Sequence, residues 1–233
     1  MTSKALSSVG IIPDGNRRYA KKYNLSLPQA YARGVEKARQ AVEWLDDYPS
    51  IKNVTFYTLS MENFRRSQTE LNVLLGLFKG QIENALKTDF FKDNDISPRF
   101  IGRLDLMPAP ILSLMKRAEE DNSDLSRNLN VAIAYTGREE IVSAAKRLAE
   151  DHKQGLVDLD KVNEENFLKY LYLDDSPDLV FRTGDVSRLS GFLTYQSAYS
   201  EFYFAKKLWP EVEKEDFAQA VDFYTGVQRN FGK

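Results

Sequence analysis

Short apolar runs alternate with amphipathic stretches along the chain, and this alternation restricts the possible folds more than any other feature of the sequence. The runs are rich in β-branched and aromatic residues, as buried strands are. They cover residues 9–12, 54–59, 99–101, 129–135, 179–182 and 202–204. The stretches between them repeat apolar residues at spacings of three and four, which is typical of helices that pack one face against a core. We expect such helices around residues 31–45, 71–86, 141–149 and 217–227.

A chain in which strands and helices alternate in this way is expected to form a mostly parallel sheet covered on both faces. The sequence predicts one α/β domain over residues 1–233 with a six-stranded sheet flanked by helices, because no linker or repeat divides it. No stretch resembles a signal peptide or approaches the roughly 20 consecutive apolar residues of a membrane span. We therefore expect a cytoplasmic protein that could still contact a membrane surface.

Composition excludes several kinds of site. The chain has 32 Lys and Arg against 34 Asp and Glu, and this balance argues against a nucleic-acid-binding protein, which usually carries a basic excess. It has no cysteine, which excludes disulfides and zinc sites built on thiolates. Its one histidine, His152, lies among charged residues near a predicted helix end. We interpret it as solvated, and a site that needs two histidines is impossible.

Polar and basic residues gather directly after the predicted strands. In an open parallel sheet, ligands bind beyond the carboxyl ends of the strands. This rule selects residues 14–18, 60–66, 136–138 and 182–190, and all four segments contain arginine. Their clustering is the first indication of a functional site.

The first of these segments, PDGNRRYAKK, joins a strand end to a helix start. Gly15 permits a tight turn and a close approach of the backbone, and the helix start offers N–H groups that suit a phosphate. Arg17 and Arg18 add positive charge, and Asp14 could bind Mg²⁺ through an oxygen atom. The alternative is a helix-capping aspartate before a solvated basic helix, and this segment alone does not decide between the two.

The second and third segments differ in how strongly they indicate function. SMENFRRS offers a hydroxyl, an amide and two guanidinium groups, but alone it is more typical of a polar loop with a helix cap at Ser67 or Thr69. RTGDVSRLS places Arg182 and Arg188 six residues apart among hydroxyl groups. A guanidinium fork pairs well with phosphate oxygens, so this segment favours diphosphate binding.

Two acidic features have different interpretations. Glu201 lies among aromatic residues, where an unpaired carboxylate is costly to bury, so a metal or an arginine partner is expected. Residues 174–178, DDSPD, have the letters of the aspartate-rich motif of trans-prenyltransferases. That motif requires a helix, which Pro177 would break, and a second copy, which this chain lacks. We interpret the run as a solvated turn.

Five motifs follow one another along nearly the whole chain, from about Val9 to Gly232. They are IIPDGNRRYAKK, TFYTLSMENFRRSQTE, LNVAIAYTGREEI, DLVFRTGDVSRLSGFLTYQSAYSEFYF and LWPE. Together they resemble the cis-prenyltransferase family, which includes undecaprenyl and dehydrodolichyl diphosphate synthases. The NRRYAKK and ENFRRS motifs are closer to archaeal and eukaryotic members than to typical bacterial ones.

The resemblance implies a Mg²⁺-dependent homodimeric enzyme that condenses isopentenyl diphosphate with an allylic prenyl diphosphate and releases pyrophosphate. The allylic diphosphate would be bound by Gly15, Asn16, Arg17 and Arg18. The isopentenyl diphosphate would be bound by Arg66, Arg182, Arg188 and Ser190. Mg²⁺ would be bound by Asp14 and Glu201, the latter from the same or the neighbouring subunit. Ser60 and Asn63 would lie beside Asp14 at the reacting groups.

The reaction implied by the resemblance needs positive charge around the diphosphate and exclusion of water around the carbocation. Mg²⁺ and arginine neutralise the pyrophosphate as the allylic C–O bond breaks, and a hydrophobic tunnel shields the carbocation from water. We expect residues 71–91 and an apolar helix that begins near residue 106 to line the tunnel. Candidates for its floor are Phe78, Phe90, Phe91 and Phe100.

Several positions depart from the family pattern. Leu27 and Tyr31 stand where many members have Arg and His, Asp185 replaces a common Gly, and Asn230 replaces the Arg of a terminal Arg-Phe-Gly. Chain elongation is the favoured function. Irregular coupling of two short prenyl diphosphates, a prenyl-diphosphate-binding subunit of a heteromeric synthase, and a non-enzymatic phospholigand-binding module are the alternatives. Asp14 argues against the subunit, because non-catalytic subunits of the family usually lose it.

Overall fold

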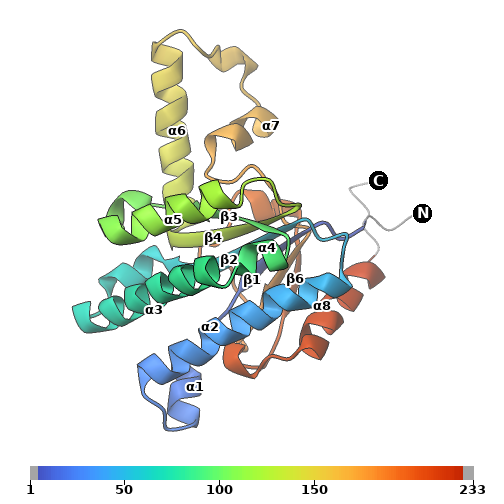
Figure 1. Ribbon diagram of the computed structural model, residues 1–233. Coiled ribbons are helices and arrows are strands. Elements are labelled where there is room, and N and C mark those ends of the chain that lie inside the picture. The colour runs from blue at the N-terminus through green and yellow to red at the C-terminus, as the bar shows by residue number, and fades with distance from the viewer. Residues whose placement is uncertain (1–4, 228–233) are drawn as a thin grey trace.

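The computed structural model describes residues 5–227 and contains one parallel six-stranded sheet with the strand order β3-β4-β2-β1-β5-β6 (Figure 1). The strands are β1 Ser8–Ile12, β2 Asn53–Ser60, β3 Ile96–Ile101, β4 Arg127–Tyr135, β5 Leu179–Arg182 and β6 Glu201–Phe204. Each contains the run predicted from the sequence. Strand β3 begins earlier than predicted and includes Pro98, which is tolerated because β3 lies at an edge of the sheet.

The helices are α1 Asn16–Lys22, α2 Leu27–Glu43, α3 Gln68–Lys87, α4 Phe90–Asp93, α5 Ala109–Asp121, α6 Gly137–Lys153, α7 Glu164–Phe167 and α8 Lys214–Gly226. Local chemistry explains where α2 and α3 begin. The Ser26 side chain accepts a hydrogen bond from the Gln29 N–H at the start of α2, and Ser67 caps α3 in the same way, as predicted. The capping residues therefore determine where the two helices beside the site begin.

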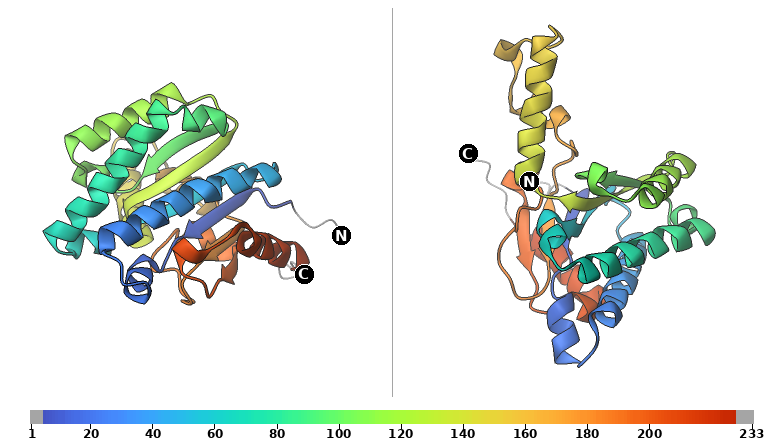
Figure 2. Two further views of the ribbon diagram at one scale, coloured as in Figure 1. Left: turned by 60° about the horizontal axis from the view of Figure 1, so that its bottom comes forward. Right: turned by 90° about the vertical axis from the view of Figure 1, so that its left-hand side faces the viewer.

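One face of the sheet is covered by α2, α3 and α5, which lie side by side (Figures 1 and 2). The large core on this face combines strand residues with apolar residues of α2, α3, α5 and α8, among them Val9, Ile11, Phe56, Phe78, Ile111 and Phe217. Successive residues of a strand point to opposite faces. Ile12 accordingly belongs to the smaller core on the other face.

The other face is covered mainly by the segment between β5 and β6. Phe192 and Leu193 of this segment are fully buried against Tyr57 and Tyr135. Gly10 allows this approach, because a Cβ there would lie 2.7 Å from the Phe192 ring. Helix α6 begins beside this segment and then projects from the body of the molecule together with α7 (Figure 2).

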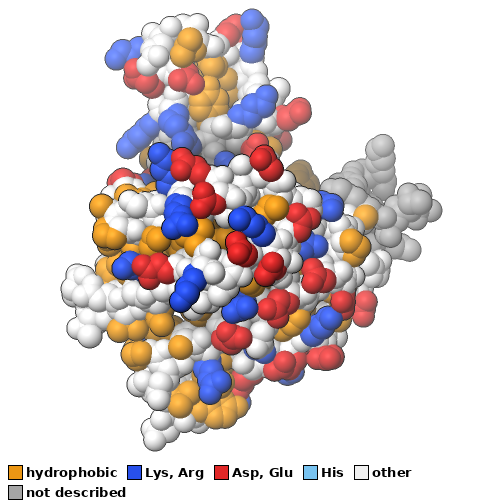
Figure 3. All heavy atoms as spheres, viewed as in Figure 1, with side chains coloured by type: hydrophobic (Ala, Val, Ile, Leu, Met, Phe, Trp, Pro, Cys, Tyr) orange, Lys and Arg blue, Asp and Glu red, His pale blue; other side chains and the backbone are white. Residues whose placement is uncertain are grey.

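The surface agrees with the composition. Basic and acidic side chains are interspersed over the face shown in Figure 3. His152 is exposed in the last turn of α6, as predicted. None of the helices in the described part of the chain combines the length and the hydrophobicity of a membrane span.

The run at residues 174–178 is an irregular segment with a bend at Asp178, and the prediction that it is solvated was wrong for Asp178. This carboxylate is 4% exposed. It accepts hydrogen bonds from the Ser7 hydroxyl (2.8 Å) and from the backbone N–H groups of Ser7 (3.0 Å) and Ser8 (3.1 Å). Because β5 lies beside β1 in the sheet, the residues before β5 meet the start of β1. Asp178 therefore anchors a strand.

Candidate active site

A cavity of about 860 Å³ opens at the carboxyl ends of the strands. Its polar part is lined by Asp14, Arg17, Arg18, Ser60, Asn63, Arg66, Arg138, Arg182, Arg188 and Ser190. All four segments selected from the sequence therefore meet in one place, because parallel strands bring their carboxyl ends to the same edge of the sheet. We call this part the charged mouth.

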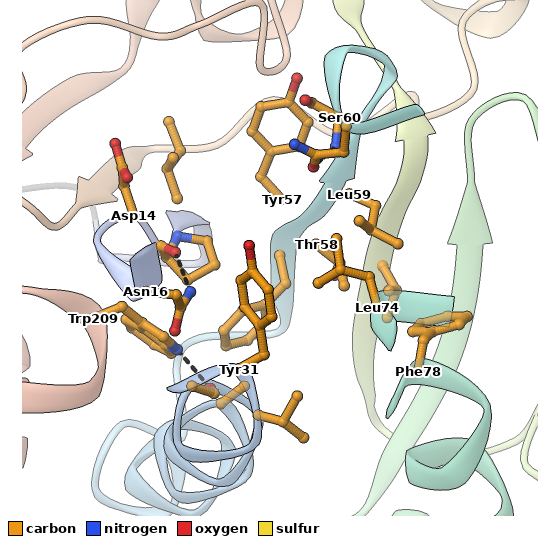
Figure 4. Close-up of a pocket in the computed structure, with 18 of the residues that line it drawn as sticks. Asp14, Asn16, Tyr31, Tyr57, Thr58, Leu59, Ser60, Leu74, Phe78 and Trp209 are labelled. Atoms are coloured by element: carbon orange, nitrogen blue, oxygen red, sulfur yellow. Dashed lines mark hydrogen bonds between the residues drawn. The ribbon is translucent and has the colours of Figure 1, made fainter. Parts of the chain in front are cut away.

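The rest of the cavity is mainly apolar, and we call it the apolar depth. It is lined by Val35, Ala38, Val42, Phe56, Leu74, Leu77, Phe78, Ile82, Ala85, Phe90, Phe91, Leu129 and Val131, and the polar residues Arg39, Gln81 and Asn84 of α2 and α3 also line the cavity. Phe56 of β2 pairs with Val131 of β4. It lies four residues before Ser60, so the two residues are about 13 Å apart along the strand. Figure 4 shows Asp14 and Ser60 at one end of the pocket and Phe78 at the other.

The lining of the depth agrees only in part with the sequence predictions. Helix α3 contributes as expected, and so do Phe78, Phe90 and Phe91. Phe100 does not line the cavity; its ring packs edge-on against Phe78, with 6.0 Å between centroids. The expected contribution of the helix near residue 106 was wrong, because that helix begins at Ala109 and packs within the core instead.

Asp14 lies in the turn between β1 and α1. Gly15 makes the turn possible, because its φ of +121° is unfavourable for other residues and a Cβ would lie 2.9 Å from the Leu208 backbone. The Asp14 carboxylate pairs with Arg182 Nη2 at 2.8 Å and with Arg18 Nη2 at 3.3 Å. Two of the predicted arginines therefore converge on the predicted metal ligand.

Arg182, Arg188 and Ser190 form one hydrogen-bonded group on the β5 side of the mouth. Arg182 Nη1 donates to Ser190 Oγ (2.9 Å) and to the Arg188 carbonyl oxygen, and Arg188 Nε donates to Ser190 Oγ (3.2 Å). The Arg182 Nε atom is buried without a hydrogen-bond partner. Asp185, whose charge would repel a diphosphate, is exposed and does not line the cavity.

Arg66 lies in the segment that follows β2, and β1 lies between β2 and β5, the strand that carries Arg182. Its Nη1 donates to the Tyr31 hydroxyl oxygen (2.9 Å) and to Glu70 Oε1 (2.7 Å), and the Tyr31 hydroxyl donates to Glu70 Oε1 (2.7 Å). Arg17 Nε lies 4.0 Å from the same carboxylate oxygen. Sequence reasoning missed Glu70, because Arg66 lies before the first residue of α3 and the four-residue spacing that pairs charges within a helix does not apply to it.

The pKa values of this cluster follow from its contacts. Burial and the hydrogen bond to Glu70 raise the pKa of Tyr31 to about 12. Burial pushes the pKa of Glu70 upward, but hydrogen bonds from Tyr31 and Arg66 and the nearby positive charges outweigh it and leave that pKa below its ordinary value. At neutral pH the phenol is therefore protonated and the carboxyl group ionised.

Ser60 and Asn63 occupy the turn that follows β2. The Asn63 side-chain oxygen accepts a hydrogen bond from the Ser60 N–H at 2.9 Å. The hydroxyl of Tyr57, on the same strand, lies 3.2 Å from the backbone oxygens of both Ser190 and Tyr135 and shares its one proton between them. This hydroxyl links β2 to the segment that carries the group around Arg182.

The sequence analysis missed a buried carboxylate, Glu140, which hydrogen-bonds to the end of β4 and to the segments before β5 and β6. Glu140, in the first turn of α6, is fully buried and accepts hydrogen bonds from the Tyr135 hydroxyl, from Gln196 Nε2 (3.1 Å) and from the Tyr172 N–H (2.7 Å). Burial raises the pKa of Glu140. Glu140 is part of the motif TGREEI, but nothing in the sequence distinguished this glutamate from Glu139.

Glu201 lies at the other end of the sheet from Asp14. It pairs with Leu179 at the start of β5, whereas Asp14 follows Ile12, which pairs with Arg182 at the end of β5. The offset between Glu201 and Ile12 is three residues, or about 10 Å along a strand, and Asp14 lies two residues beyond Ile12. Glu201 does not line the cavity, and no group of three or more potential metal-ligating side chains occurs within residues 5–227.

The mouth nevertheless suits Mg²⁺. This ion commonly uses one or two carboxylates together with substrate phosphates and water. Asp14 supplies a carboxylate that is 33% exposed, surrounded by arginines that can bind the phosphates. One protein ligand is therefore compatible with a metal that arrives with a diphosphate. Asn230, at one of the positions that depart from the family pattern, lies outside the described residues.

Comparison with known proteins agrees with the geometry. The model of the undecaprenyl diphosphate synthase family matches residues 12–232. A tritrans,polycis-undecaprenyl-diphosphate synthase (geranylgeranyl-diphosphate specific) from Pyrobaculum aerophilum is 40% identical, covering 99% of this chain and 97% of its own. An isoprenyl transferase from Thermus thermophilus is 39% identical, covering 97% and 88%.

A crystal structure provides the corresponding comparison of folds. Lavandulyl diphosphate synthase from Lavandula x intermedia, in complex with dimethylallyl diphosphate, superposes with a TM-score of 0.93 and 29% identity, covering 98% of this chain and 99% of that one. The match therefore extends over the sheet, the helices and the charged mouth. The chain belongs to the undecaprenyl diphosphate synthase family and is a cis-prenyltransferase.

Proposed function

We propose that this prenyltransferase extends geranylgeranyl diphosphate by repeated cis addition of isopentenyl units, with Mg²⁺ as its cofactor. Cis-prenyl chain elongation is the activity of its curated relatives, and the name of the Pyrobaculum aerophilum enzyme specifies this starter. The observation that carries the proposal is the arrangement of the cavity, in which an arginine-rich mouth leads to a depth lined by apolar side chains. A diphosphate with a long hydrocarbon tail has this division of polarity.

The two diphosphates would occupy opposite sides of the mouth. We assign the isopentenyl diphosphate to Arg182, Arg188 and Ser190, where the unpartnered Arg182 Nε shows spare donor capacity. The turn of Gly15, Asn16, Arg17 and Arg18 would bind the allylic diphosphate, whose tail then enters the depth. The position of Arg66 beside Glu70 and Arg17 favours the allylic side for this residue, rather than the isopentenyl side expected from the sequence.

Asp14 would hold Mg²⁺, which supplies positive charge to the departing pyrophosphate. The structure contributes the remaining charge through guanidinium groups. Arg18 and Arg182 contact the Asp14 carboxylate in this structure, and both become available to phosphate oxygens when that carboxylate is engaged elsewhere. Fixed guanidinium groups of this kind stabilise developing charge effectively because they need little reorganisation.

The reaction forms a bond between the allylic C1 and the terminal carbon of the isopentenyl unit, breaks the allylic C–O bond and releases one proton. Ser60 and Asn63 lie in the mouth on the β2 side, where the two substrates would meet. Neither side chain is a strong base at neutral pH. In this proposal they orient the isopentenyl unit, and the pyrophosphate accepts the proton.

A homodimer would explain the distant position of Glu201. Strand β6 is an edge of the sheet, and apolar side chains are exposed beside it, including Phe204 and Tyr199, the latter 81% exposed. In this proposal a second copy covers that edge, and Glu201 reaches the metal of the partner. Release of a long apolar product would favour contact with a membrane surface.

Irregular coupling of short prenyl diphosphates is the second candidate. It is favoured by the close structural match to lavandulyl diphosphate synthase. Two five-carbon substrates, however, would leave most of the apolar depth empty, and the depth extends about 13 Å along β2 from the mouth. The shape of the cavity therefore favours elongation.

A product assay separates the two candidates. Purified protein is incubated with Mg²⁺ and labelled isopentenyl diphosphate, together with dimethylallyl, farnesyl or geranylgeranyl diphosphate, and products are sized by chromatography. We expect a series of lengthened products from geranylgeranyl diphosphate that disappears with a chelator. A ten-carbon product from dimethylallyl diphosphate alone, without isopentenyl incorporation, would establish irregular coupling instead.

A further inference from the structure

The ring of Tyr31 lines the cavity without a role in the reaction described above. It belongs to α2 and is 7% exposed. Figure 4 shows the ring entering the pocket, with its hydroxyl toward the end where Asp14 and Ser60 lie. A phenol in this place could bind a phosphate directly or act through a neighbour, and its contacts decide between the two.

Both hydrogen-bonding directions of the Tyr31 hydroxyl are in use. Its proton is donated to Glu70 at 2.7 Å, and its oxygen accepts from Arg66 at 2.9 Å. A phenol has one proton to donate, so Tyr31 has none for a phosphate oxygen while the bond to Glu70 persists. The hydroxyl is therefore placed to act on Arg66 and not on the substrate.

Arg66 can keep these contacts and still bind a substrate. Both of its hydrogen bonds in the cluster use Nη1. A guanidinium group has five N–H donors in a rigid plane, so fixing one nitrogen fixes the direction of the others. Arg66 itself lines the charged mouth, whereas Glu70 does not line the cavity.

We propose that Tyr31 is a positioning residue, which together with Glu70 holds the Arg66 guanidinium in the orientation that binds the diphosphate of the allylic substrate. The inference deepens the proposed function and rests on it for the identity of that substrate. It also gives the tyrosine at this position a role in the diphosphate site. The Tyr31 hydroxyl orients the Arg66 guanidinium, and Arg66 supplies the positive charge.

Tyr57 provides an internal comparison on the other side of the same cavity. Its hydroxyl contacts the Ser190 backbone oxygen, next to the proposed isopentenyl site. Removal of the hydroxyl from Tyr31 should therefore weaken the allylic side, and removal from Tyr57 should weaken the isopentenyl side. A general loss of stability would affect both sides in both variants.

The experiment measures binding of pyrophosphate to the full chain in Mg²⁺, with saturating isopentenyl diphosphate present so that the second diphosphate site is occupied. For Tyr31→Phe we expect the Kd of pyrophosphate to rise roughly five- to tenfold, which corresponds to the net contribution of one ordinary hydrogen bond. The KM for geranylgeranyl diphosphate should rise in parallel, while the KM for isopentenyl diphosphate stays within about twofold. Tyr170→Phe removes a hydroxyl that donates to Asp151 far from the cavity, and it serves as the matched control.

A double-mutant cycle with Arg66→Met tests whether Tyr31 acts through Arg66. In the Arg66→Met background, Tyr31→Phe should change the Kd by less than about twofold, because the group it positions is gone. An equal rise in both backgrounds, no rise in either, or no pyrophosphate binding by the wild type would overturn the inference. Coupling between the two residues without extension of geranylgeranyl diphosphate would instead leave the positioning role intact and contradict the proposed starter.

Discussion

The charged mouth and the apolar depth belong to one cavity but are built in different ways. In the mouth, side chains from distant segments are fixed by directed contacts, such as Arg182 with Asp14 and Arg66 with Glu70. In the depth, side chains such as Phe78 and Phe90 are held mainly by packing, with the Arg39 guanidinium over the Phe90 ring. Directed contacts fail when one atom is changed, whereas packed apolar surfaces adjust to moderate changes in volume.

This difference implies that the two parts control different properties of the reaction. The mouth should determine whether bonds are broken and made, and the depth should determine how long the product becomes. Substitutions in the mouth are therefore expected to change rates and substrate affinities, and substitutions in the depth to change product length. The following predictions test this division.

The largest expected effect is on turnover, from Asp14→Asn in the mouth. Loss of the carboxylate charge removes the proposed metal ligand and should lower kcat by roughly 10³-fold, comparable to removal of one key electrostatic group from other active sites. Incorporation of labelled isopentenyl diphosphate measures it. Asp185→Asn makes the same change at an exposed position outside the cavity and should retain kcat within about twofold. An Asp14→Asn enzyme with wild-type turnover would contradict the assignment.

The second prediction concerns affinity. Arg188→Ala removes a guanidinium from the group around Ser190, and we expect the KM for isopentenyl diphosphate to rise about 10- to 100-fold, as for loss of a charge-assisted hydrogen bond. The KM for the allylic substrate should change much less. Arg117→Ala on the exposed surface of α5 is the control. Equal increases in both KM values would mean that the two diphosphates are not separated as proposed.

The third prediction tests the support behind the mouth. Glu140→Gln keeps the shape of the side chain but places an NH₂ group among hydrogen-bond donors from Tyr135, Gln196 and Tyr172. We expect the free energy of unfolding to fall by about 1–3 kcal/mol, because a buried donor loses its acceptor. Urea denaturation measures the change, and Glu139→Gln, one residue earlier, is the matched control.

The pH dependence of stability gives a second readout for Glu140. Its pKa in the folded protein is raised above the ordinary value of 4.5, so the folded state binds this proton more tightly than the unfolded state. Protonated Glu140 therefore contributes to the stability of the folded state, and this contribution is fully present below pH 4.5. It is lost as the pH rises from 4.5 through the raised pKa of the folded state. Glu140→Gln should lack this component. An unchanged pH profile would show that Glu140 does not titrate as its burial implies.

The smallest effect on rate is expected in the depth. Phe90→Ala enlarges the cavity at a half-buried position and should lengthen the product while kcat stays within about threefold. Chromatography of the products measures the change. Phe100→Leu opens space behind Phe78 and outside the cavity, so it should leave the product length unchanged. A shift in length from Phe100→Leu alone would place the floor elsewhere.

Much of the fold could be predicted from the sequence because it depends on local patterns. Strand and helix periodicities located all six strands, and Ser67 was correctly identified as a candidate cap of α3. The rule for carboxyl ends of parallel strands then placed Asp14, Ser60, Arg138 and Arg182 in one cavity. None of these inferences required knowledge of how the layers pack.

Other features depend on contacts between distant segments, which periodicity does not reveal. The sequence predicted a solvated turn at residues 174–178, but Asp178 is buried and accepts three hydrogen bonds from Ser7 and Ser8. The helix near residue 106 was expected at the cavity and lies behind it. Glu70 and Glu140 gained their roles from partners on other elements.

The sequence by itself determined the order of strands and helices, the family and the residues that carry charge at the strand ends, because each depends on residue types at short spacings. Only the tertiary structure decided how those residues are grouped. It separated Arg66 from Arg182, paired Tyr31 with Glu70 and set Glu201 apart from Asp14. Hydrogen bonds and ion pairs act over a few ångströms, so their partners are known only when the packing of the sheet and helices brings them together.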